Sequence, residues 1–269
     1  MFFAGNWLSD QPEKRRAEIF FLAYSPVWMV LMAVMVFTGW DKTFTNTQLL
    51  IHSLIVALPL LLVPAAIEIK GASKSNIKRS WLNSYWLKAN LFIGIFGFFG
   101  NYFGSYYFFD VLGMVYNYPN ATTNLDSALL NQREQPVPVI MYLYTHAYFM
   151  TYHTTANLVL RKINVIDKRL FFLPIAFLVG YVWAWIETKA MANPLMASSF
   201  YYKNMPAMLA YGSAIYACYF IVSFPIFFLI DERKNHKWSL QTVCMSALAA
   251  SMMVFYLLDI AAHIVKALY

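Results

Sequence analysis

The chain's best candidates for chemistry are ionisable side chains that interrupt long apolar runs. Glu187 ends the apolar run 171–186. His146 and His153 lie in a second run, and Asp259 lies in a third. An ionisable side chain within a membrane-spanning helix costs roughly 2.5–3.5 kcal/mol on insertion scales, so it usually faces an interior cavity and has a function. The pattern therefore indicates proton chemistry or proton transport.

The spacing of these residues adds to the prediction. His146, His153 and Asn157 are separated by seven and four positions, which places them on one face of a helix. Such a stripe could shuttle a proton or hold a hydroxyl group. Alternatively, it hydrogen-bonds to neighbouring helices and only holds the bundle together. Asp259 and His263 are four residues apart, the spacing at which a carboxylate orients an imidazole.

Motifs for other chemistries are missing from the sequence. The five histidines form no His-x-x-His-His cluster of the kind that di-iron oxygenases need, and there is no Cys-x-x-Cys. No glycine-rich phosphate loop follows a strand, and no serine sits in a nucleophile elbow. We therefore expect acid–base chemistry, with no metal and no cofactor.

Composition identifies the environment of these residues. Of the 269 residues 60% are hydrophobic and only 12% are charged, and the mean hydropathy is +0.51. A soluble domain is about 25% charged, so the sequence predicts a polytopic membrane protein. A net charge of +7 would suggest nucleic acid in a soluble protein. Here the basic residues cluster in short loops, which is a topology signal, and we expect membrane lipid and no nucleic acid as partner.

The predicted fold is all-α, a single integral membrane domain over 1–269 with about seven transmembrane helices. A span needs about 20 apolar residues, and strands are excluded because seven such segments cannot close a barrel. The expected spans lie near 19–37, 49–69, 87–109, 137–160, 170–188, 208–230 and 240–264.

Basic residues predict the orientation. They concentrate in the N-terminal tail and in alternate loops, namely at 14–16, 70–79, 161–169 and 233–237. The positive-inside rule then places the N-terminus in the cytoplasm and the C-terminus outside. The first span should act as an uncleaved signal anchor. The membrane would be the endoplasmic reticulum in a eukaryote and the cytoplasmic membrane in a bacterium, and the oligomeric state stays open.

Several polar segments resemble the cycloeucalenol cycloisomerases, also called cyclopropyl sterol isomerases. The similarity runs in order through nearly the whole chain. In the first half of the chain the segments that carry it are 14–28 (KRRAEIFFLAYSPVW), 85–91 (YWLKANL), 100–103 (GNYF) and 107–109 with 111–113. In the fourth span the matching residues are Thr145, His146, Tyr152, His153 and Asn157. Further along the chain they are Glu187 with Thr188, 216–225 (YACYFIVSFP) with Asp231 and Glu232, and Leu258 with Asp259. Departures fall in loops, chiefly at 110–136 and after Ile69.

The resemblance implies an enzyme that opens the 9,19-cyclopropane ring of a cyclosterol without a redox cofactor. A proton must reach carbon 19, and a base must remove the proton at carbon 8. Glu187 is then the expected acid, because a carboxylic acid kept away from water retains its proton. His146 or His153 would be the base. Asp259 would be an alternate acid or would orient the base, and the acid and base assignments are also reversible.

The resemblance also implies residues that hold the substrate. Trp183, Tyr152 and Tyr219 would stabilise the carbocation through their ring faces. Asn101 or Asn157 would bind the 3-hydroxyl group.

Two alternatives remain. One is a sterol double-bond isomerase that works by protonation and deprotonation without ring opening. The other is a seven-helix sterol-binding protein or a proton-coupled transporter, although a transporter favours broken helices in paired half-repeats and the sequence shows no internal repeat.

Overall fold

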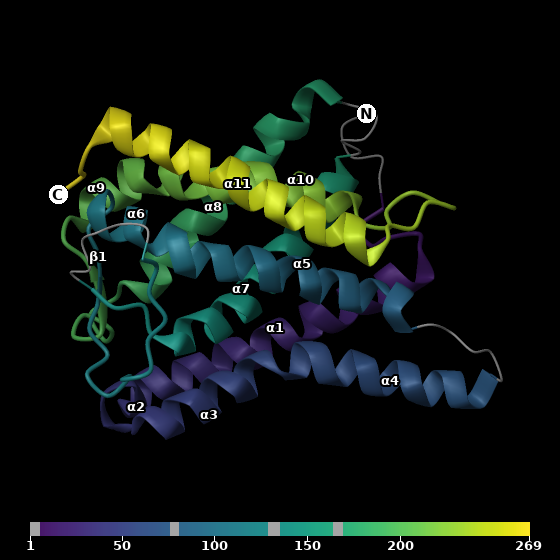
Figure 1. The fold of residues 1–269 in the computed structure, drawn as a ribbon, viewed down its shortest axis with the longest axis horizontal. Helices are drawn as coiled ribbons and strands as arrows, with labels where there is room; N and C mark the ends of the chain where they lie inside the picture. Colours follow the sequence, from purple (N-terminus) through teal and green to yellow (C-terminus); the bar gives the residue numbers. More distant parts are fainter. Residues whose placement is uncertain (1–5, 76–80, 129–134, 164–168) are drawn as a thin grey trace.

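The computed structural model describes residues 6–75, 81–128, 135–163 and 169–269, and it is a bundle of long helices (Figure 1). The long helices are α1 (Pro12–Thr38), α3 (Asn46–Ala57), α4 (Pro59–Ser75), α5 (Tyr85–Phe99), α7 (Val139–Lys162), α8 (Arg169–Met191), α10 (Ser213–Leu229) and α11 (Leu240–Val265). Shorter elements are α2 (Trp40–Thr43), a 3-10 turn (Trp81–Asn83), α6 (Ser105–Asp110), α9 (Met205–Ala207) and two π-helical segments (Gly100–Gly104 and Met208–Gly212).

All seven predicted apolar runs are helical in the structure. Within the described residues, four helices are long and apolar enough to cross a membrane: Pro12–Thr38, Phe171–Met191, Met205–Leu229 and Leu240–Val265. A fifth is added if α3 and α4, bent by 43° at their junction, count as one span. The chain is therefore a helical membrane protein. α7 is long enough to span, but its mean hydropathy is too low because threonines, tyrosines and histidines interrupt its apolar residues. α5 is too short because the π segment Gly100–Gly104 follows it.

Local signals explain where several helices begin and end. α1 ends at Gly39, whose φ of 69° is left-handed and whose N–H reaches the carbonyls of Met35 and Val36. Glycine is the residue that adopts this conformation without steric cost. α3 begins with a capping box in which Thr45 and Gln48 satisfy each other's backbone N–H groups. Ser239 caps α11 by accepting from the Thr242 N–H.

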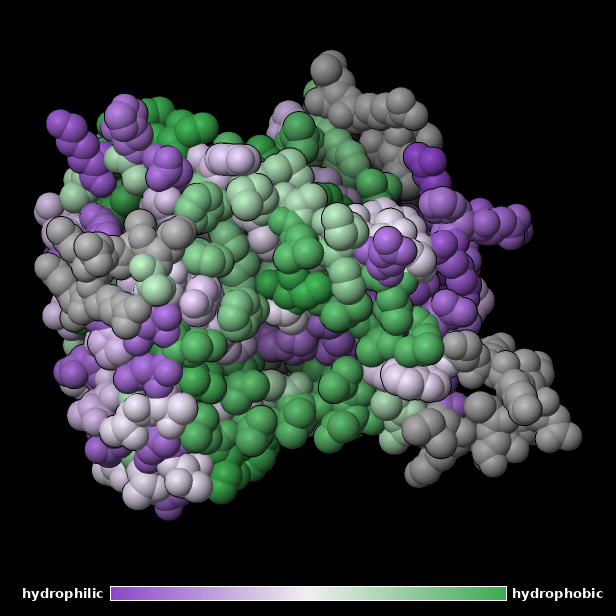
Figure 2. Space-filling model, viewed as in Figure 1, coloured by the Kyte–Doolittle hydropathy of each residue, from purple (hydrophilic) through white to green (hydrophobic). Residues whose placement is uncertain are grey.

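Helix α7 is the centre of the bundle. It packs against α1, α3, α5, α8 and α10, and most of its side chains are buried. α10 lies against α8 and α11, and α11 also packs on α5. Figure 2 shows the result at the surface, a broad hydrophobic band with hydrophilic residues gathered at the two ends of the bundle.

A short β-ribbon was missing from the all-α expectation. β1 (Met114–Tyr116) pairs antiparallel with β2 (Phe200–Tyr202), with Val115 opposite Tyr201. The two strands belong to loops that leave the bundle at the same end, where Figure 1 places β1 with α9, α6 and the C-terminus. Buried backbone N–H and C=O groups need partners. The two loops satisfy part of that need by pairing with each other.

Candidate active site

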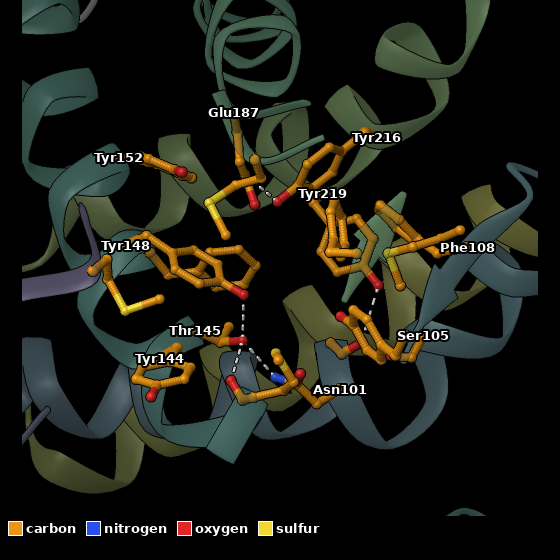
Figure 3. Close-up of a pocket in the computed structure, with 18 of the residues that line it drawn as sticks. Asn101, Ser105, Phe108, Tyr144, Thr145, Tyr148, Tyr152, Glu187, Tyr216 and Tyr219 are labelled. Atoms are coloured by element: carbon orange, nitrogen blue, oxygen red, sulfur yellow. Dashed lines mark hydrogen bonds between the residues drawn. The ribbon is translucent and has the colours of Figure 1, made fainter. Parts of the chain in front are cut away.

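A small cavity lies near the end of the bundle that carries the β-ribbon (Figure 3). Its volume is about 100 Å³. Side chains from α1, α6, α7, α8 and α10 form the walls, together with the π segment Gly100–Gly104. β1, β2 and Tyr118 contribute side chains at the ribbon end. Polar groups of several distant segments therefore meet in one space.

Glu187 points into this cavity from α8. The Tyr216 hydroxyl donates to its Oε2 at 2.6 Å, and Tyr152 hydrogen-bonds to the same carboxyl group. Glu187 is the only carboxyl group among the described residues that line the cavity, and those residues include no lysine, arginine or histidine. The carboxyl group is thus held by two phenols and has no ion-pair partner there.

A chain of hydrogen bonds crosses the floor of the cavity. The Thr145 hydroxyl donates to the Met141 carbonyl at 2.7 Å, so it accepts from Tyr148 at 2.7 Å and from Asn101 at 2.8 Å. The second N–H of the Asn101 amide donates to the Gly97 carbonyl at 2.8 Å. Its Oδ1 has no hydrogen-bond partner in the described part of the chain, which leaves one acceptor for a ligand.

Aromatic rings form much of the remaining wall. Tyr219 lies edge-on to Phe108, with ring centroids 5.8 Å apart, and its hydroxyl reaches the Gly100 carbonyl at 3.4 Å. A side chain at Gly104 would overlap the Tyr219 hydroxyl, because a Cβ there would lie 1.6 Å from it. The π segment and its glycines therefore let Tyr219 sit directly against the α5–α6 backbone. π-helical turns of this kind are frequent at functional sites.

Six cavity tyrosines were not predicted from the sequence: Tyr116, Tyr118, Tyr144, Tyr148, Tyr202 and Tyr216. Tyr144 and Tyr148 could have been found, because with Tyr152 they recur every four residues on one helical face. Tyr116 and Tyr202 come from loops whose pairing only the fold reveals. Burial raises the pKa of Tyr116 and Tyr118, so both loop phenols stay protonated at neutral pH.

The structure brings four of the predicted residues together and separates the others. Glu187, Asn101, Tyr152 and Tyr219 line the cavity. Trp183 lies behind the wall, stacked on Tyr152 with centroids 4.5 Å apart.

The two histidines lie outside the cavity lining. His153 is fully buried among phenylalanines, where its Nδ1 donates to the Phe149 carbonyl at 2.7 Å and its Nε2 accepts from Ser223 at 2.8 Å. His146 Nε2 bonds to Asn90 Oδ1 at 2.8 Å on another side of α7. These contacts fit the interpretation in which the histidine stripe holds helices together.

Asn157 and Asp259 are also remote from the cavity. Asn157 donates to Glu18 at 3.3 Å, and Asp259 is exposed on α11, where it accepts from Tyr107 at 3.0 Å. No group of three histidine, cysteine or acidic side chains that could hold a metal ion occurs in the ranges that the structure describes.

A second polar cluster, the charged network, closes the opposite end of the bundle. It consists of Lys14, Glu18, Arg161 and Glu232. Arg161 bonds to Glu18 and to Glu232, each at 2.7 Å, and Lys14 bonds to Glu232 at 2.9 Å. The two positive and two negative charges balance. Burial opposes ionisation of Glu232, yet the hydrogen bonds and charges of Arg161 and Lys14 hold its pKa below the ordinary value.

The fold and the cavity together define a helical membrane protein that encloses one unpaired carboxyl group among phenols, a site suited to proton transfer. Over 262 residues the chain is 34% identical to the cycloeucalenol cycloisomerase of Arabidopsis thaliana, a match that covers 94% of this chain and 87% of the relative. No family model matches the chain, and no solved structure matches it. The chain belongs to the cycloeucalenol cycloisomerase family, as its sequence motifs predict, and it is an isomerase.

Proposed function

We propose that this enzyme opens the 9,19-cyclopropane ring of a cyclosterol such as cycloeucalenol and forms a Δ8 sterol of the obtusifoliol type. The observation that carries the proposal is the single carboxyl group of Glu187, held by two tyrosines in a small cavity with aromatic walls. Such a site offers a proton donor, excludes water and tolerates positive charge. The relative from Arabidopsis thaliana carries the name of this activity.

The reaction is an isomerisation whose protons balance. One proton is added to carbon 19 while the bond from carbon 9 to carbon 19 breaks, and carbon 9 is left positively charged. Loss of the hydrogen at carbon 8 as a proton then places the double bond between carbons 8 and 9. No oxidant or reductant is needed.

Glu187 is the proposed acid. The hydroxyls of Tyr216 and Tyr152 stabilise the carboxylate that remains once its proton has left. Because this carboxylate is the only one facing the cavity in the described chain, it is also the proposed base for the proton at carbon 8. This assignment replaces the two-group site expected from the sequence, since His146, His153 and Asp259 lie elsewhere.

The cavity walls serve the cationic intermediate and the substrate's hydroxyl. Tyr219, Tyr152 and Phe149 present aromatic rings to the cavity, and ring faces stabilise a nearby cation. A bound sterol between these aromatic walls displaces water, which would otherwise capture the cation. The unpartnered Oδ1 of Asn101 is the proposed acceptor for the 3-hydroxyl group.

The proposal includes seven spans with the N-terminus in the cytoplasm. Its support is that all seven apolar runs are helical and that α7, the most polar of them, lies in the centre of the bundle rather than against lipid. The charged network and the basic loops then lie at the cytoplasmic end, and the cavity lies toward the outer end.

Deuterium labelling tests both the reaction and the single-carboxyl site. Purified protein in lipid nanodiscs would convert cycloeucalenol in D₂O, with the product's new methyl group analysed by mass spectrometry. We expect one deuterium in a single turnover and less label in rapid multiple turnover, because the proton from carbon 8 returns to Glu187 and is delivered next.

Two outcomes would count against this assignment. Equal label in both regimes would overturn the single-carboxyl site. No conversion of any cyclosterol would overturn the proposed function, and conversion of a Δ8 sterol alone would favour the double-bond isomerase.

A further inference from the structure

An apolar groove runs along the membrane-facing surface of α5, outside the cavity. On one side of α5 it measures about 360 Å³ and is bounded by α3, α4 and α7, and on the other side it measures about 650 Å³ and is bounded by α11. Asn90, Leu91, Gly94 and Phe98 line both parts. Figure 2 shows hydrophilic atoms at the bottom of a hollow in the otherwise hydrophobic band. We call this surface the α5 groove.

A polar pair, Asn90 and His146, lies in the groove, and its hydrogen bonds determine the histidine tautomer. The Asn90 amide uses both N–H groups as donors, to the Leu60 carbonyl at 3.0 Å and to the Trp86 carbonyl at 2.8 Å. Its Oδ1 therefore accepts from His146 Nε2, 2.8 Å away. In a neutral imidazole the other nitrogen is then an acceptor. His146 Nδ1 has no partner in the described ranges, so it offers one lone pair to the groove.

The groove and the cavity are separated by one layer of packing between α5 and α7. A Cβ at Gly97, which lines the groove, would lie 3.4 Å from Thr145 Cγ2, and Thr145 lines the cavity. The bond between Asn101 and Thr145, at 2.8 Å, joins the same two helices. Two single hydrogen bonds and glycine contacts thus close the seam between α5 and α7, together with the aromatic pairs Phe98–Tyr142, Phe96–Phe149 and Phe92–His153.

The cavity is too small for a whole sterol. Pockets that take ligands of this size measure roughly 300–1,000 Å³, and the cavity measures about 100 Å³. The substrate dissolves in the bilayer, so its shortest path to Glu187 passes sideways through the seam.

We propose that the α5 groove binds the 3-hydroxysterol substrate from the bilayer and passes it to the cavity between α5 and α7. This inference rests on the proposed function. His146 Nδ1 accepts a hydrogen bond from the 3-hydroxyl group, and the flat ring system lies on Gly94, where a Cβ would meet no atom within 4 Å. The groove residues include no lysine or arginine to hold a phosphate, so the site fits an uncharged lipid with one hydroxyl rather than a phospholipid.

Filling the groove tests the proposal. Gly94→Phe places a ring in the groove, since a Cβ at this position would meet no atom within 4 Å, and Val30→Phe adds the same ring to an exposed position of α1, which is 60% accessible. In nanodiscs with cycloeucalenol we expect Gly94→Phe to lower kcat/KM by about tenfold or more with kcat within about twofold, the signature of lost substrate binding. Val30→Phe should match the wild type. Equal kcat/KM in the two variants would overturn the groove as the route.

Photolabelling of the wild-type protein tests binding without any variant. The probe is a 3-hydroxysterol with a diazirine in ring B, in phosphatidylcholine nanodiscs. We expect label on peptides covering Leu87–Phe98 and Tyr142–His146, displaced by cycloeucalenol several-fold better than by its 3-O-methyl ether. Label spread evenly over the lipid-facing helices, or competed equally by phospholipid, would overturn the site. A protein that binds the probe in the groove but converts no cyclosterol would refute the proposed function and leave the groove standing.

Discussion

The two ends of this helix bundle both bury carboxyl groups, but the partners of these groups differ. In the charged network Glu18 and Glu232 are paired with Arg161 and Lys14 at 2.7 to 2.9 Å. In the cavity Glu187 has only phenols as partners and faces open volume. One end holds compensated charges in fixed positions. The other keeps a carboxyl group free to exchange its proton.

This difference separates structural from chemical roles. Removing one partner of a buried ion pair leaves an uncompensated charge, so the network holds this end of α1, α7 and α10 together. A carboxyl group beside a cavity with no cation near it is the typical setting of a proton donor.

The sharpest test of the comparison is the Glu187→Gln variant. The amide keeps the shape and the Tyr216 contact but has no acidic proton, and general acid–base catalysis typically contributes 10²–10⁴-fold. We expect kcat for cycloeucalenol to fall by about 10³-fold while the thermal unfolding midpoint stays close to that of the wild type. The measurement is turnover by sterol mass spectrometry together with a melting curve in detergent.

Asp259→Asn is the matched control for that variant. It makes the same chemical change at an exposed carboxylate on α11, so turnover should be retained. Wild-type turnover in Glu187→Gln would remove Glu187 from the mechanism.

The opposite end should respond in stability rather than in chemistry. Arg161→Met leaves Glu18 as a buried carboxylate without an ion-pair partner and leaves Glu232 with Lys14 alone, and breaking a buried pair typically costs about 3–5 kcal/mol. We expect a much lower unfolding midpoint, while molecules that remain folded keep their turnover rate. Lys237→Met removes an exposed pair with Glu13, in which Lys237 is 56% accessible, and should change stability by about 0–1 kcal/mol. Equal unfolding midpoints for the two variants would show that the charged network stabilises the protein no more than an exposed ion pair does.

A smaller effect is expected from Tyr216→Phe. It removes one hydrogen bond to the Glu187 carboxyl group, and bonds to charged groups contribute about 1.5–3 kcal/mol. Turnover should fall roughly ten- to a hundredfold with folding intact. Tyr211→Phe removes a hydroxyl that is 68% accessible and serves as the control. An unchanged rate in Tyr216→Phe would mean that Tyr152 alone supports the carboxylate.

The smallest effect concerns pH and the network. The pKa of Glu232 is depressed in the folded protein, so its contribution to stability is present above the ordinary value of 4.5 and is lost as pH falls through the lower folded value. The difference in unfolding midpoint between wild type and Glu232→Gln should be constant from pH 7 to pH 5 and shrink below 4.5. A difference that grows on acidification would contradict the pairing.

Much of the fold could be predicted because lipid imposes simple rules on sequence. Every apolar run became a helix, and α7 spans Val139–Lys162 where 137–160 was expected. Glu187 could be chosen because a carboxyl group in an apolar run is conspicuous on its own. The surroundings of the histidines could not be predicted in this way. Periodicity showed that His146 and His153 share a face of α7, but not that His153 lies among phenylalanines and His146 in the α5 groove.

The sequence alone determined the class of protein, its helices and its family, because hydrophobic length, charge and local motifs are properties of neighbouring residues. Tertiary structure alone decided which polar groups meet. Tyr116 and Tyr202 reach the cavity through a β-ribbon between two loops, Tyr216 meets Glu187 across α10 and α8, and Glu18 finds Arg161 more than a hundred residues away. These contacts depend on how helices pack against one another, and no local pattern carries that information.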